Sequence, residues 1–506
     1  MRLLLYILLF STSLNSFTQT NLYVPIDFST IQEALNAASN GDTVLVSPGT
    51  YYENIIWPSM NGIALKSVNG PSNTIINGGE MGPIITFSTP VSIDTTSIIS
   101  GFTLTAWEYG GYGVAINAAD PTIENIVIDG SFSEEDFSPG IYVNNATSII
   151  IRHSRINNVY WGIQISNSVN SNNIQIYNNT ISNCDRAIYV SGQAQDNDEI
   201  LIKNNIIFNN YAGIYMSQSE ALISNNIVVN NYQPLTCLGW TCGGGNLCFG
   251  VSPSLNNNVF AYNDNGPLFG YNNSVVQSNL FFENIGIENN DSDLISMSAY
   301  SVTSPSFNNN HFLNNGGDHI IVSGLEDINA TNNWWGEISE EEIFNHILDG
   351  VTEFNLGYVD YSMALETPDL GVPIAPPINC ILSIASDVNL TSTNLTWNIN
   401  FEGDLAGYKL YYGNYNGYSF ENVIDLGNVT SFSTELLNTY ADSVIAITAY
   451  DHDADGDNDQ LEGHESWFAF FTKLTGCTDD LACNYDDSIF EDDGSCEYSE
   501  EFYDCD

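Results

Sequence analysis

The middle of the chain repeats a short phrase in which two polar residues, usually both Asn, precede an apolar pair. The phrase reads NNTISN at 178–183, NNIIFN at 204–209 and NNIVVN at 225–230. Its second residue returns at intervals of 26, 21, 32, 21, 31 and 23 residues. A period of about 20–30 residues built from short β-prone units indicates a solenoid, in which each repeat adds one coil. The returning positions are Asn179, Asn205, Asn226, Asn258, Asn279, Asn310 and Asn333.

A second phrase indicates which side chains of the coil face inward. It reads G-I-Y-V at 140–143 and returns in related form at 162–165, 187–190 and 213–216. Alternation along a strand places the Ile and the last apolar residue inside the coil. The residue between them then faces outward, and rungs that stack at about 4.8 Å should bring these residues into one column. The predicted column consists of Tyr142, Gln164, Tyr189 and Tyr215.

We expect the returning Asn residues to form a structural ladder and not a binding site. Asn tolerates the left-handed αL backbone, and its side chain can hydrogen-bond to the Asn of the next rung. The two longest intervals then indicate insertions into the coil, at 233–249 and near 288–300.

The charge of the chain limits its partners. Its 506 residues include 61 Asp and Glu but only 8 Lys and Arg, which gives a formal charge of −53. Such a field repels nucleic acid and anionic membrane surfaces, so we exclude both as partners. It favours cations, with Ca²⁺ as the main candidate, and a merely solvated acidic surface is the alternative. Because 43% of the residues are hydrophobic, the acidity does not predict disorder.

Residues 1–19 have the features of a secretory signal peptide, with Arg2 followed by an apolar run at 3–10. No later stretch reaches about 18 uninterrupted apolar residues, so we expect no transmembrane helix and no membrane insertion. The sequence therefore predicts a secreted protein, either extracellular or at the cell surface. The 9 Cys are then potential disulfide partners, and their odd number leaves at least one outside any pairing within the chain.

The segment at 29–77 has a characteristic order of one helix and several strands. A helix N-cap at Ser29 or Thr30 precedes a short amphipathic helix predicted over 31–38. Turns then separate predicted strands at 43–46, 51–56, 63–67 and 74–76. This order resembles the entry cap of right-handed parallel β-helix proteins of the pectate-lyase-like superfamily, which implies that the helix covers the open end of the coil.

The resemblance gives the boundaries of the solenoid. We expect the cap and first coils at 20–100 and the repeats at 101–336. The phrase TNNWWG at 331–336 resembles the closing coil of bacterial right-handed β-helix repeat proteins. An acidic, helix-prone patch around 340–348 and a Pro-rich linker at 368–377 make up the connection at 337–377.

Two smaller parts follow the connection. At 378–474, the phrases LTWNIN, DLAGYKLYYG and SVIAITAYD resemble strands of a fibronectin type III domain, with Trp397 as its core Trp and Tyr408 and Tyr450 at its aromatic positions. The tail at 475–506 resembles a Cys-rich module found near the C-termini of secreted Bacteroidetes proteins. Its four Cys allow three pairings into two disulfides. The predicted fold is therefore all-β: a right-handed parallel β-helix solenoid, then a β-sandwich, then a small disulfide-rich tail. The tail Cys are Cys477, Cys483, Cys496 and Cys505.

The phrase DHDADGDNDQLE at 451–462 matches the EF-hand calcium loop, D-x-D-x-D-G-x5-E. The spacing lets alternate carboxylates converge on one ion, while Gly456 makes the sharp turn. Asn458 stands where an apolar residue is usual, and strands in place of helices flank the loop, so a solvated acidic loop is the alternative. The candidate Ca²⁺ ligands are Asp451, Asp453, Asp455, Asp457, Asp459 and Glu462.

The segments between the two repeated phrases should project from one edge of the coil. They place aromatic residues beside carboxylates and amides, which suits sugar rings, because C–H faces stack on aromatics while hydroxyls take hydrogen bonds. The alternative is that these aromatics pack on one another and close the edge. The candidate sugar-binding residues in the segments and the column are Trp107, Tyr109, Tyr142, Trp161, Tyr189, Tyr215 and Trp240.

Catalytic candidates are few. The superfamily includes lyases with a basic residue and Ca²⁺, hydrolases with clustered Asp, and esterases with a Gln–Asp pair. The chain shows neither the Asp cluster nor the Gln–Asp pair. Asp185 and Arg186 form the best adjacent pair, and Arg152 and Lys203 share an outward position that is more often a surface feature.

We therefore expect a secreted or cell-surface β-helix protein that binds a polysaccharide or cell-surface glycan through the aromatic and acidic edge of its coil. One alternative is a polysaccharide lyase or hydrolase that acts on polyuronates. Another is a structural spacer or adhesin without catalytic activity.

Overall fold

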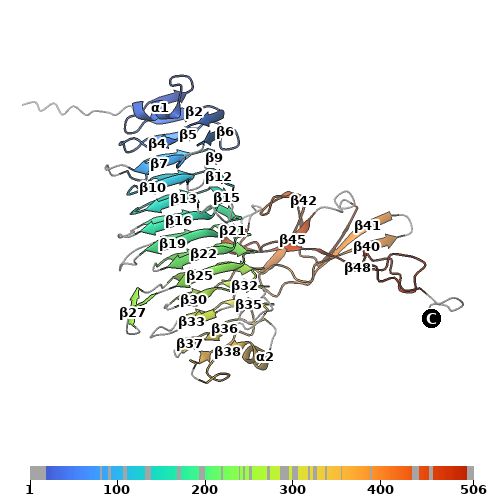
Figure 1. Cartoon of the computed structure of the whole chain (residues 1–506). Coiled ribbons are helices and arrows are strands. Elements are labelled where there is room, and N and C mark those ends of the chain that lie inside the picture. Colours follow the sequence, from blue (N-terminus) through green and yellow to red (C-terminus); the bar gives the residue numbers. More distant parts are fainter. Residues whose placement is uncertain are drawn as a thin grey trace, which may run out of the picture.

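The structure of the protein, a computed structural model, shows a tall solenoid with a second β-domain against its flank (Figure 1). It describes residues 19–498 except 80–81, 89–92, 106–110, 132–137, 168–172, 193–199, 218–219, 239, 243–245, 250–252, 271–273, 285–295, 299–305, 317–319, 323–326, 337–338, 355, 388–389, 436–443 and 455–459. The predicted signal peptide lies almost entirely outside the described residues. Across the described ranges, no helix has the length and apolar character needed to cross a membrane.

Successive coils add strands to three parallel sheets, which confirms the predicted parallel β-helix. Within the described residues, sheet A has 14 strands, sheet B has 11 and sheet C has 12.

The strands of sheet A are β1 (Asn21–Val24), β2 (Thr43–Val46), β5 (Ala64–Ser67), β8 (Ile98–Ser100), β11 (Thr122–Glu124), β14 (Ile150–Arg152), β17 (Ile174–Tyr177), β20 (Ile200–Lys203), β23 (Leu222–Ser224), β28 (Ser254–Asn256), β31 (Val275–Gln277), β34 (Ser306–Asn308), β37 (Ile328–Asn329) and β39 (Val359–Asp360). Those of sheet B are β3 (Gly49–Tyr52), β6 (Thr74–Asn77), β9 (Thr103–Thr105), β12 (Val127–Asp129), β15 (Arg155–Asn157), β18 (Thr180–Ser182), β21 (Ile206–Phe208), β24 (Ile227–Val229), β29 (Val259–Ala261), β32 (Leu280–Phe282) and β35 (His311–Leu313).

The strands of sheet C are β4 (Ile55–Ile56), β7 (Ile85–Ser88), β10 (Val114–Asn117), β13 (Pro139–Asn144), β16 (Trp161–Asn167), β19 (Arg186–Gly192), β22 (Ala212–Ser217), β25 (Gln233–Leu238), β30 (Leu268–Gly270), β33 (Ser296–Ser298), β36 (Ile320–Val322) and β38 (Ile347–Leu348). The insertion after β25 forms an antiparallel hairpin of β26 (Trp240–Cys242) and β27 (Asn246–Phe249).

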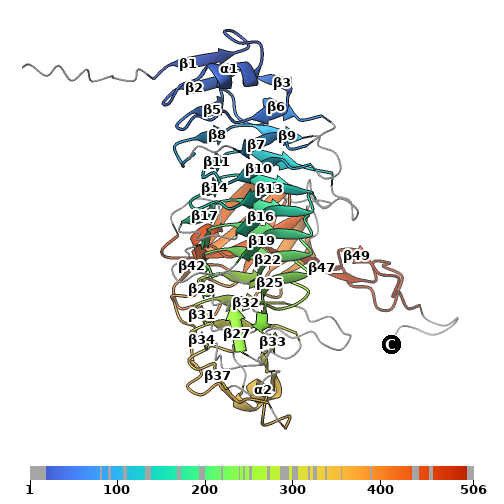
Figure 2. The same cartoon turned by 60° about the vertical axis from the view of Figure 1, so that its left-hand side comes forward.

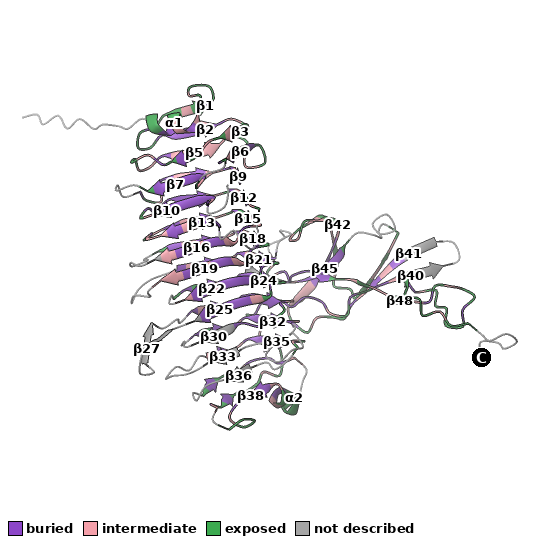
Figure 3. Ribbon diagram, in the orientation of Figure 1, coloured by how far each residue is buried: buried purple, intermediate pink, exposed green. Residues whose placement is uncertain are grey.

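The register of sheet C confirms the predicted outward column. Tyr142 pairs with Gln164, Gln164 with Tyr189, and Tyr189 with Tyr215. Their apolar neighbours Ile163 and Ile188 have no exposed surface, so they fill the interior of the coil. Figure 3 shows the same division along the solenoid, with buried residues on the strands and exposed residues in the turns.

The returning Asn residues form the predicted ladder. Asn226 has no exposed surface, and its Oδ1 accepts hydrogen bonds from the backbone N–H of Asn205 (3.0 Å) and from Asn205 Nδ2 (2.9 Å). Its own N–H and Nδ2 donate to Asn258 Oδ1 in the same way, at 3.0 Å each. The expectation that these residues adopt the αL backbone is wrong. The residue before each of them does so, for example Asn204 (φ 54°) and Asn225 (φ 54°), because the corner must turn before the next amide can point inward.

A second Asn ladder, absent from the sequence prediction, runs along another corner. Its geometry is the same: Asn231 Oδ1 accepts from the backbone N–H and Nδ2 of Asn210, at 3.0 Å each. The members of this second ladder are Asn210, Asn231, Asn263, Asn284 and Asn315.

The first coil is capped as predicted. Helix α1 (Ile31–Ala37) begins after Thr30, whose side chain accepts a hydrogen bond from the backbone N–H of Glu33 at 3.1 Å. Ile31, Ala34 and Leu35 are buried, so the apolar face of the helix covers the open end of the coil. The strand predicted at 51–56 is in fact two short strands, β3 and β4, on different sheets. At the other end, α2 (Glu340–Asn345) has a capping box between Ser339 and Glu342.

The predicted β-sandwich is present. Trp397 and Tyr408 lie in its core and contact each other edge to face, with ring centroids 5.4 Å apart. One sheet contains β40 (Ile381–Asp387), β41 (Leu390–Thr396), β44 (Ser431–Thr434) and β47 (Thr472–Lys473). The other contains β42 (Leu405–Tyr415), β43 (Phe420–Gly427), β45 (Ile445–Asp451) and β46 (Ala469–Phe470). A 3₁₀ helix, η2 (Leu461–Gly463), lies between β45 and β46.

The tail is stapled by a disulfide between Cys477 and Cys496, and Cys483 is also disulfide-bonded. Cys505 lies outside the described residues. The tail contains a small sheet of β48 (Thr475–Gly476) and β49 (Glu491–Asp492).

The sandwich packs against the outer face of sheet B in the lower coils (Figure 1). That face is polar in the upper coils, with Thr103 on β9 and Asn157 on β15, but carries apolar residues such as Phe208, Val229 and Phe282 lower down. Burial of apolar area stabilises the contact by about 25 cal/mol per Å². The sandwich residues of this contact include Tyr411, Ala446, Trp467 and Phe468.

The Pro-rich segment at 368–377, predicted as a linker between the two domains, is packed against them. Val372 and Ala375 are buried in the same contact, and the backbone N–H of Asp369 donates to Nε2 of the buried His311 at 2.9 Å. The segment is therefore part of the seam between the solenoid and the sandwich.

Candidate functional site

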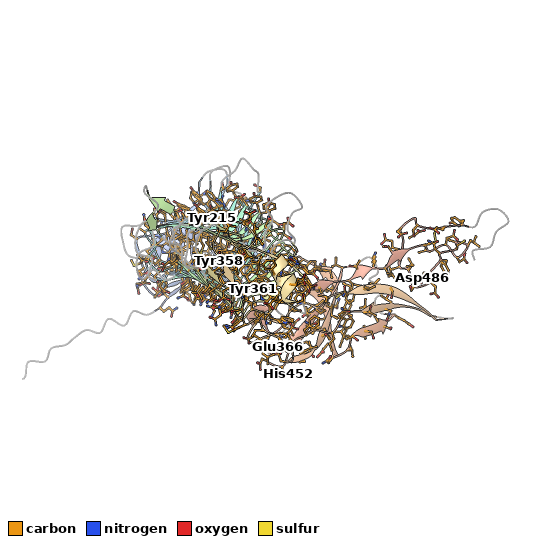
Figure 4. All side chains as sticks on the ribbon, turned by 90° about the horizontal axis from the view of Figure 1, so that it is seen from below. Tyr215, Tyr358, Tyr361, Glu366, His452 and Asp486 are labelled. Carbon is orange, nitrogen blue, oxygen red and sulfur yellow. A yellow bond between two sulfur atoms is a disulfide. The ribbon has the colours of Figure 1, made fainter. Side chains whose placement is uncertain are left out.

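Sheet C carries a run of outward aromatic rings on the side of the solenoid away from the sandwich. In Figure 2 the strands β13, β16, β19 and β22 face the viewer, and the sandwich lies behind them. Figure 4, which views the molecule from below, labels Tyr215 on this side and Asp486 in the distant tail. The site is therefore independent of the contact between the two domains.

The rings stack across successive coils. The ring of Trp161 stacks on that of Tyr189, with centroids 5.6 Å apart and planes at 15°. The rings of Tyr189 and Tyr215 follow at 5.4 Å and 42°. One coil earlier, Tyr112 stacks on Tyr142 at 5.2 Å. We call Trp161, Tyr189 and Tyr215 the aromatic column.

Arg186 is fixed beside the aromatic column. Its guanidinium Cζ lies 5.2 Å from the ring centroid of Tyr189 and 4.6 Å from that of Tyr215. Its Nε lies 3.7 Å from Oδ2 of Asp185. Cation–π contacts of this length are attractive, so the guanidinium holds both rings in place.

A polar pocket of about 560 Å³ opens where the turns lead into these strands. Tyr160 and Asp185 line it, and Tyr160 contacts Trp161 edge to face at 5.1 Å, so the pocket adjoins the aromatic column. Tyr211, with 59% of its surface exposed, lies at its edge and stacks on Tyr232. The remaining lining residues are Asn158, Asn183, Cys184 and Asn209.

Asp185 is the electrostatically unusual residue of the pocket. Its Oδ2 is buried and has no hydrogen-bond partner among the described residues. Burial raises the pKa of Asp185, and the nearby Arg186 guanidinium lowers it by a smaller amount. The carboxyl group therefore keeps a proton to higher pH than an exposed Asp. The pKa of Tyr160 is also raised, first by burial and then by the charge of Asp185.

The structure brings together only some of the predicted sugar-binding residues. Tyr142, Trp161, Tyr189 and Tyr215 lie on one face. Trp107 and Tyr109 lie outside the described residues, as does the side chain of Trp240. The sequence placed Tyr189 and Tyr215 in one outward column, but it placed Trp161 in the edge segments and did not place Arg186 against the rings. Two features of the sequence could have indicated the position of Arg186. It follows Asp185 directly, and it aligns with Trp161 of the preceding coil.

The four catalytic candidates fall on two different faces. Arg152 and Lys203 lie on sheet A in register with Tyr177, as the sequence predicted. Arg152 donates to Glu124 Oε2 through Nε at 2.9 Å and to the hydroxyl of Tyr177 at 2.8 Å. That arrangement is a surface ion pair. Asp185 is the one carboxyl group among the four candidates. Its pKa is raised, and it lines the pocket.

The candidate calcium loop is only partly described. Asp455, Asp457 and Asp459, and the side chain of Glu462, lie outside the described residues. Asp451 Oδ1 accepts the backbone N–H of Asp453 at 2.8 Å, and its Oδ2 lies 3.0 Å from Nδ1 of His464. Among the described residues, those of the loop included, no three His, Cys, Asp or Glu residues gather as a metal site. Calcium binding remains a prediction.

Comparison with known proteins supports the solenoid. Residues 91–275 match the family model described as the right handed beta helix region. None of the curated proteins compared with the chain matches it.

Three bacterial proteins are among the solved structures that are similar to this chain. DFA-IIIase from Arthrobacter chlorophenolicus A6, without its lid, is 12% identical with a TM-score of 0.48, covering 69% of this chain and 100% of that one. The GH87 alpha-1,3-glucanase from Streptomyces thermodiastaticus is 12% identical with a TM-score of 0.41, covering 65% of each chain. An alginate lyase from Paenibacillus sp. is 14% identical with a TM-score of 0.29, covering 60% of this chain and 95% of that one. The matched segment 91–275 is thus similar to right-handed β-helix proteins, and it includes every strand that bears the aromatic column.

Proposed function

We propose that the protein is a secreted or cell-surface β-helix protein that binds a neutral polysaccharide along the aromatic column of sheet C. The observation that carries this proposal is the run of three outward rings on successive coils, held by Arg186. Ring faces receive the C–H faces of sugars, and the run extends along the solenoid as a polymer does.

The polar groups beside the rings suit hydroxyls. Gln164 lies in the same outward column between Tyr142 and Tyr189, and Asn158 and Asn183 line the adjoining pocket. Amides offer both donors and acceptors, as sugar hydroxyls do. The alternative interpretation, that the rings only close the edge, is weakened because Tyr215 and Tyr189 are partly exposed.

The charge of the molecule favours neutral over acidic polymers. The chain carries a formal charge of −53, and a polyuronate would have to approach against that field. The one guanidinium at the aromatic column already faces Asp185 and two rings. We therefore place polyuronates behind neutral glycans as ligands.

A second candidate function is hydrolysis of the bound glycan, favoured by Asp185 alone. A carboxyl group with a raised pKa can hold the proton that a leaving glycosidic oxygen needs. The test is the release of reducing ends from any polymer that binds. Asp185→Asn should abolish release and retain binding. Release that persists in Asp185→Asn would remove Asp185 from the reaction.

The binding proposal is tested by native electrophoresis through gels that contain a single polysaccharide. Neutral glucans, xylan and mannan form one set, and alginate and pectate form the other. We expect at least one neutral polymer to retard the protein, with little change in about 0.5 M salt, where the Debye length falls below about 5 Å. Retardation by polyuronates alone, or by none of the polymers, would contradict the proposal.

A further inference from the structure

A cavity of about 320 Å³ lies at the seam between the last coils of the solenoid and the sandwich. Its walls come from β32, β35 and the turn after Trp335 on one side, and from residues 375–378 and 399–402 on the other. These segments meet where the sandwich joins the solenoid in Figure 1. A cavity of this volume is at the lower end of the range for small-molecule sites.

The second Asn ladder ends at this cavity. Asn284 gives both its backbone N–H and its Nδ2 to Asn315 Oδ1, at 3.1 and 2.9 Å. Asn315 lines the cavity, and its Nδ2 donates a hydrogen bond to the carbonyl oxygen of Phe281 at 2.9 Å. In the sequence, one interval of 23 residues, as from Asn310 to Asn333, leads from Asn315 to an Ile at position 338, which lies outside the described residues.

The end of the ladder therefore has an open pair of donors. Within the described part of the chain, no acceptor takes the backbone N–H of Asn315 or its second Nδ2 hydrogen. Every earlier member of the ladder directs this pair at one oxygen atom of the next Asn. A ligand oxygen can occupy the equivalent place.

The facing wall offers acceptors. Glu402 is 6% exposed, and its carboxylate accepts the backbone N–H of Ala375 at 2.8 Å and Nδ2 of Asn400 at 3.2 Å. Oδ1 of Asn400 is buried and has no hydrogen-bond partner among the described residues. A buried acceptor without a donor costs free energy, which a ligand donor would recover.

The remaining lining residues include aromatic rings beside the aliphatic Leu313, Ile378 and Ile399. Trp335 ends a stack of rings inside the coil, and its ring centroid lies 4.5 Å from that of Phe312. Phe401, 44% exposed, lines the same cavity. A negatively charged ligand would meet Glu402, whose pKa is raised by burial, and would be repelled once that group ionises.

We propose that the seam cavity is a second binding site, which takes a neutral, ring-sized molecule with hydroxyl groups. One ligand oxygen receives the donor pair of Asn315, a ligand hydroxyl donates to Asn400 or Glu402, and the ring lies against Trp335 and Phe401. This site is distinct from the aromatic column and does not depend on the proposed function.

The test uses the full chain and two probes that share this chemistry, benzyl alcohol and methyl α-D-glucopyranoside, in saturation-transfer NMR titrations. We expect saturable binding of at least one probe, with a Kd on the order of 1–10 mM for molecules of this size. Phe401→Ala removes a partly exposed wall, and Asn315→Asp replaces the second amide donor while keeping an oxygen for Asn284. Each should weaken binding about fivefold or more.

Tyr177→Ala, on the outer face of sheet A and away from both proposed sites, is the matched control and should leave the Kd unchanged. Absence of saturable binding for both probes would overturn the proposal. So would binding that is insensitive to both cavity variants, or binding that is lost in Tyr215→Ala, which would assign the probe to the aromatic column. Phe401→Ala keeps the test valid if Asn315→Asp lowers the melting temperature.

Discussion

The guanidinium of Arg186 lies over the ring of Tyr215, with 4.6 Å between Cζ and the ring centroid. It also lies over Tyr189 and faces Asp185, so one cation positions both rings and partly offsets the acid of the pocket. The aromatic column and the polar pocket are therefore one unit.

Arg186→Ala should weaken glycan binding about fivefold, because a cation–π contact contributes about 0.5–1 kcal/mol and the two rings lose their support. The glycan affinity of Arg186→Lys should lie between those of the wild type and Arg186→Ala, because the Lys ammonium lacks the planar shape of the guanidinium. The measurement is calorimetric titration with a polymer that retards the wild-type protein. Arg155→Ala, an exposed Arg on sheet B, is the control, and equal affinities for Arg186→Ala and this control would refute the role of Arg186.

His311 should make stability depend on pH. Burial lowers its pKa from 6.5 to about 4, and its Nε2 accepts the backbone N–H of Asp369, which a protonated ring cannot do. The unfolded chain therefore takes up the proton first, so the free energy of unfolding should fall as pH drops from 6.5 toward 4 and level off below that. The expected loss is about 3 kcal/mol.

The measurement is urea unfolding at several pH values for the wild type, His311→Asn and His153→Asn. At each pH, the free energy of unfolding of a variant is subtracted from that of the wild type. This difference removes the contribution of the other titrating groups. The His311 variant should lose the slope between pH 6.5 and 4, whereas the exposed His153 variant should keep it. A slope that is the same in all three proteins would rule out His311 as its source.

Asn226→Ala should destabilise the solenoid by about 3–5 kcal/mol. The substitution leaves the backbone N–H of Asn205 buried without its acceptor, at about 1–3 kcal/mol, and removes the hydrogen bonds of the Asn226 amide to Asn205 Nδ2, Ile202 O and Asn258 Oδ1, at about 1 kcal/mol each. Asn173→Ala, on the exposed surface, should change stability by no more than about 0.5 kcal/mol. The measurement is the thermal unfolding of both variants, followed by circular dichroism. Similar melting temperatures for the two variants would show that the ladder is not a main source of stability.

Lys409→Met should destabilise the sandwich by about 3–5 kcal/mol, because it leaves the carboxylate of Glu465 buried without its counter-charge. Glu465 also accepts hydrogen bonds from Tyr411 and Thr448, so it cannot turn toward solvent without breaking them. Adding Glu465→Gln to Lys409→Met should recover part of the loss. Chemical denaturation of the two single variants and the double variant gives the coupling free energy between Lys409 and Glu465. Additive losses of unfolding free energy would contradict the coupling.

The repeat was sufficient to predict the solenoid, because its period is set by local turns. Asn204 and Asn225 turn the corner with positive φ, and the buried Asn226 follows from the same phrase. The outward column followed from strand alternation, because Tyr189 and Tyr215 occupy the same place in the second repeated phrase.

Contacts between distant segments could not be predicted in this way. Nothing near His311 in the sequence indicates that Asp369 will cover it. The raised pKa of Asp185 depends on burial by neighbouring coils, which the local sequence does not encode. Phe208, Val229 and Phe282 did give a signal, since they are apolar where earlier coils are polar, and they mark where the sandwich docks.

The most direct test of the account is the affinity of the double variant Tyr189→Ala/Tyr215→Ala for a neutral polysaccharide that retards the wild-type protein. Tyr177→Ala, an outward Tyr on sheet A, is the matched control. Each lost ring should cost about 1 kcal/mol, so the double variant should bind about 30-fold more weakly while the control binds as the wild type does. Equal affinities for the double variant and the wild type, with both proteins folded, would contradict the assignment of the aromatic column as the glycan-binding surface.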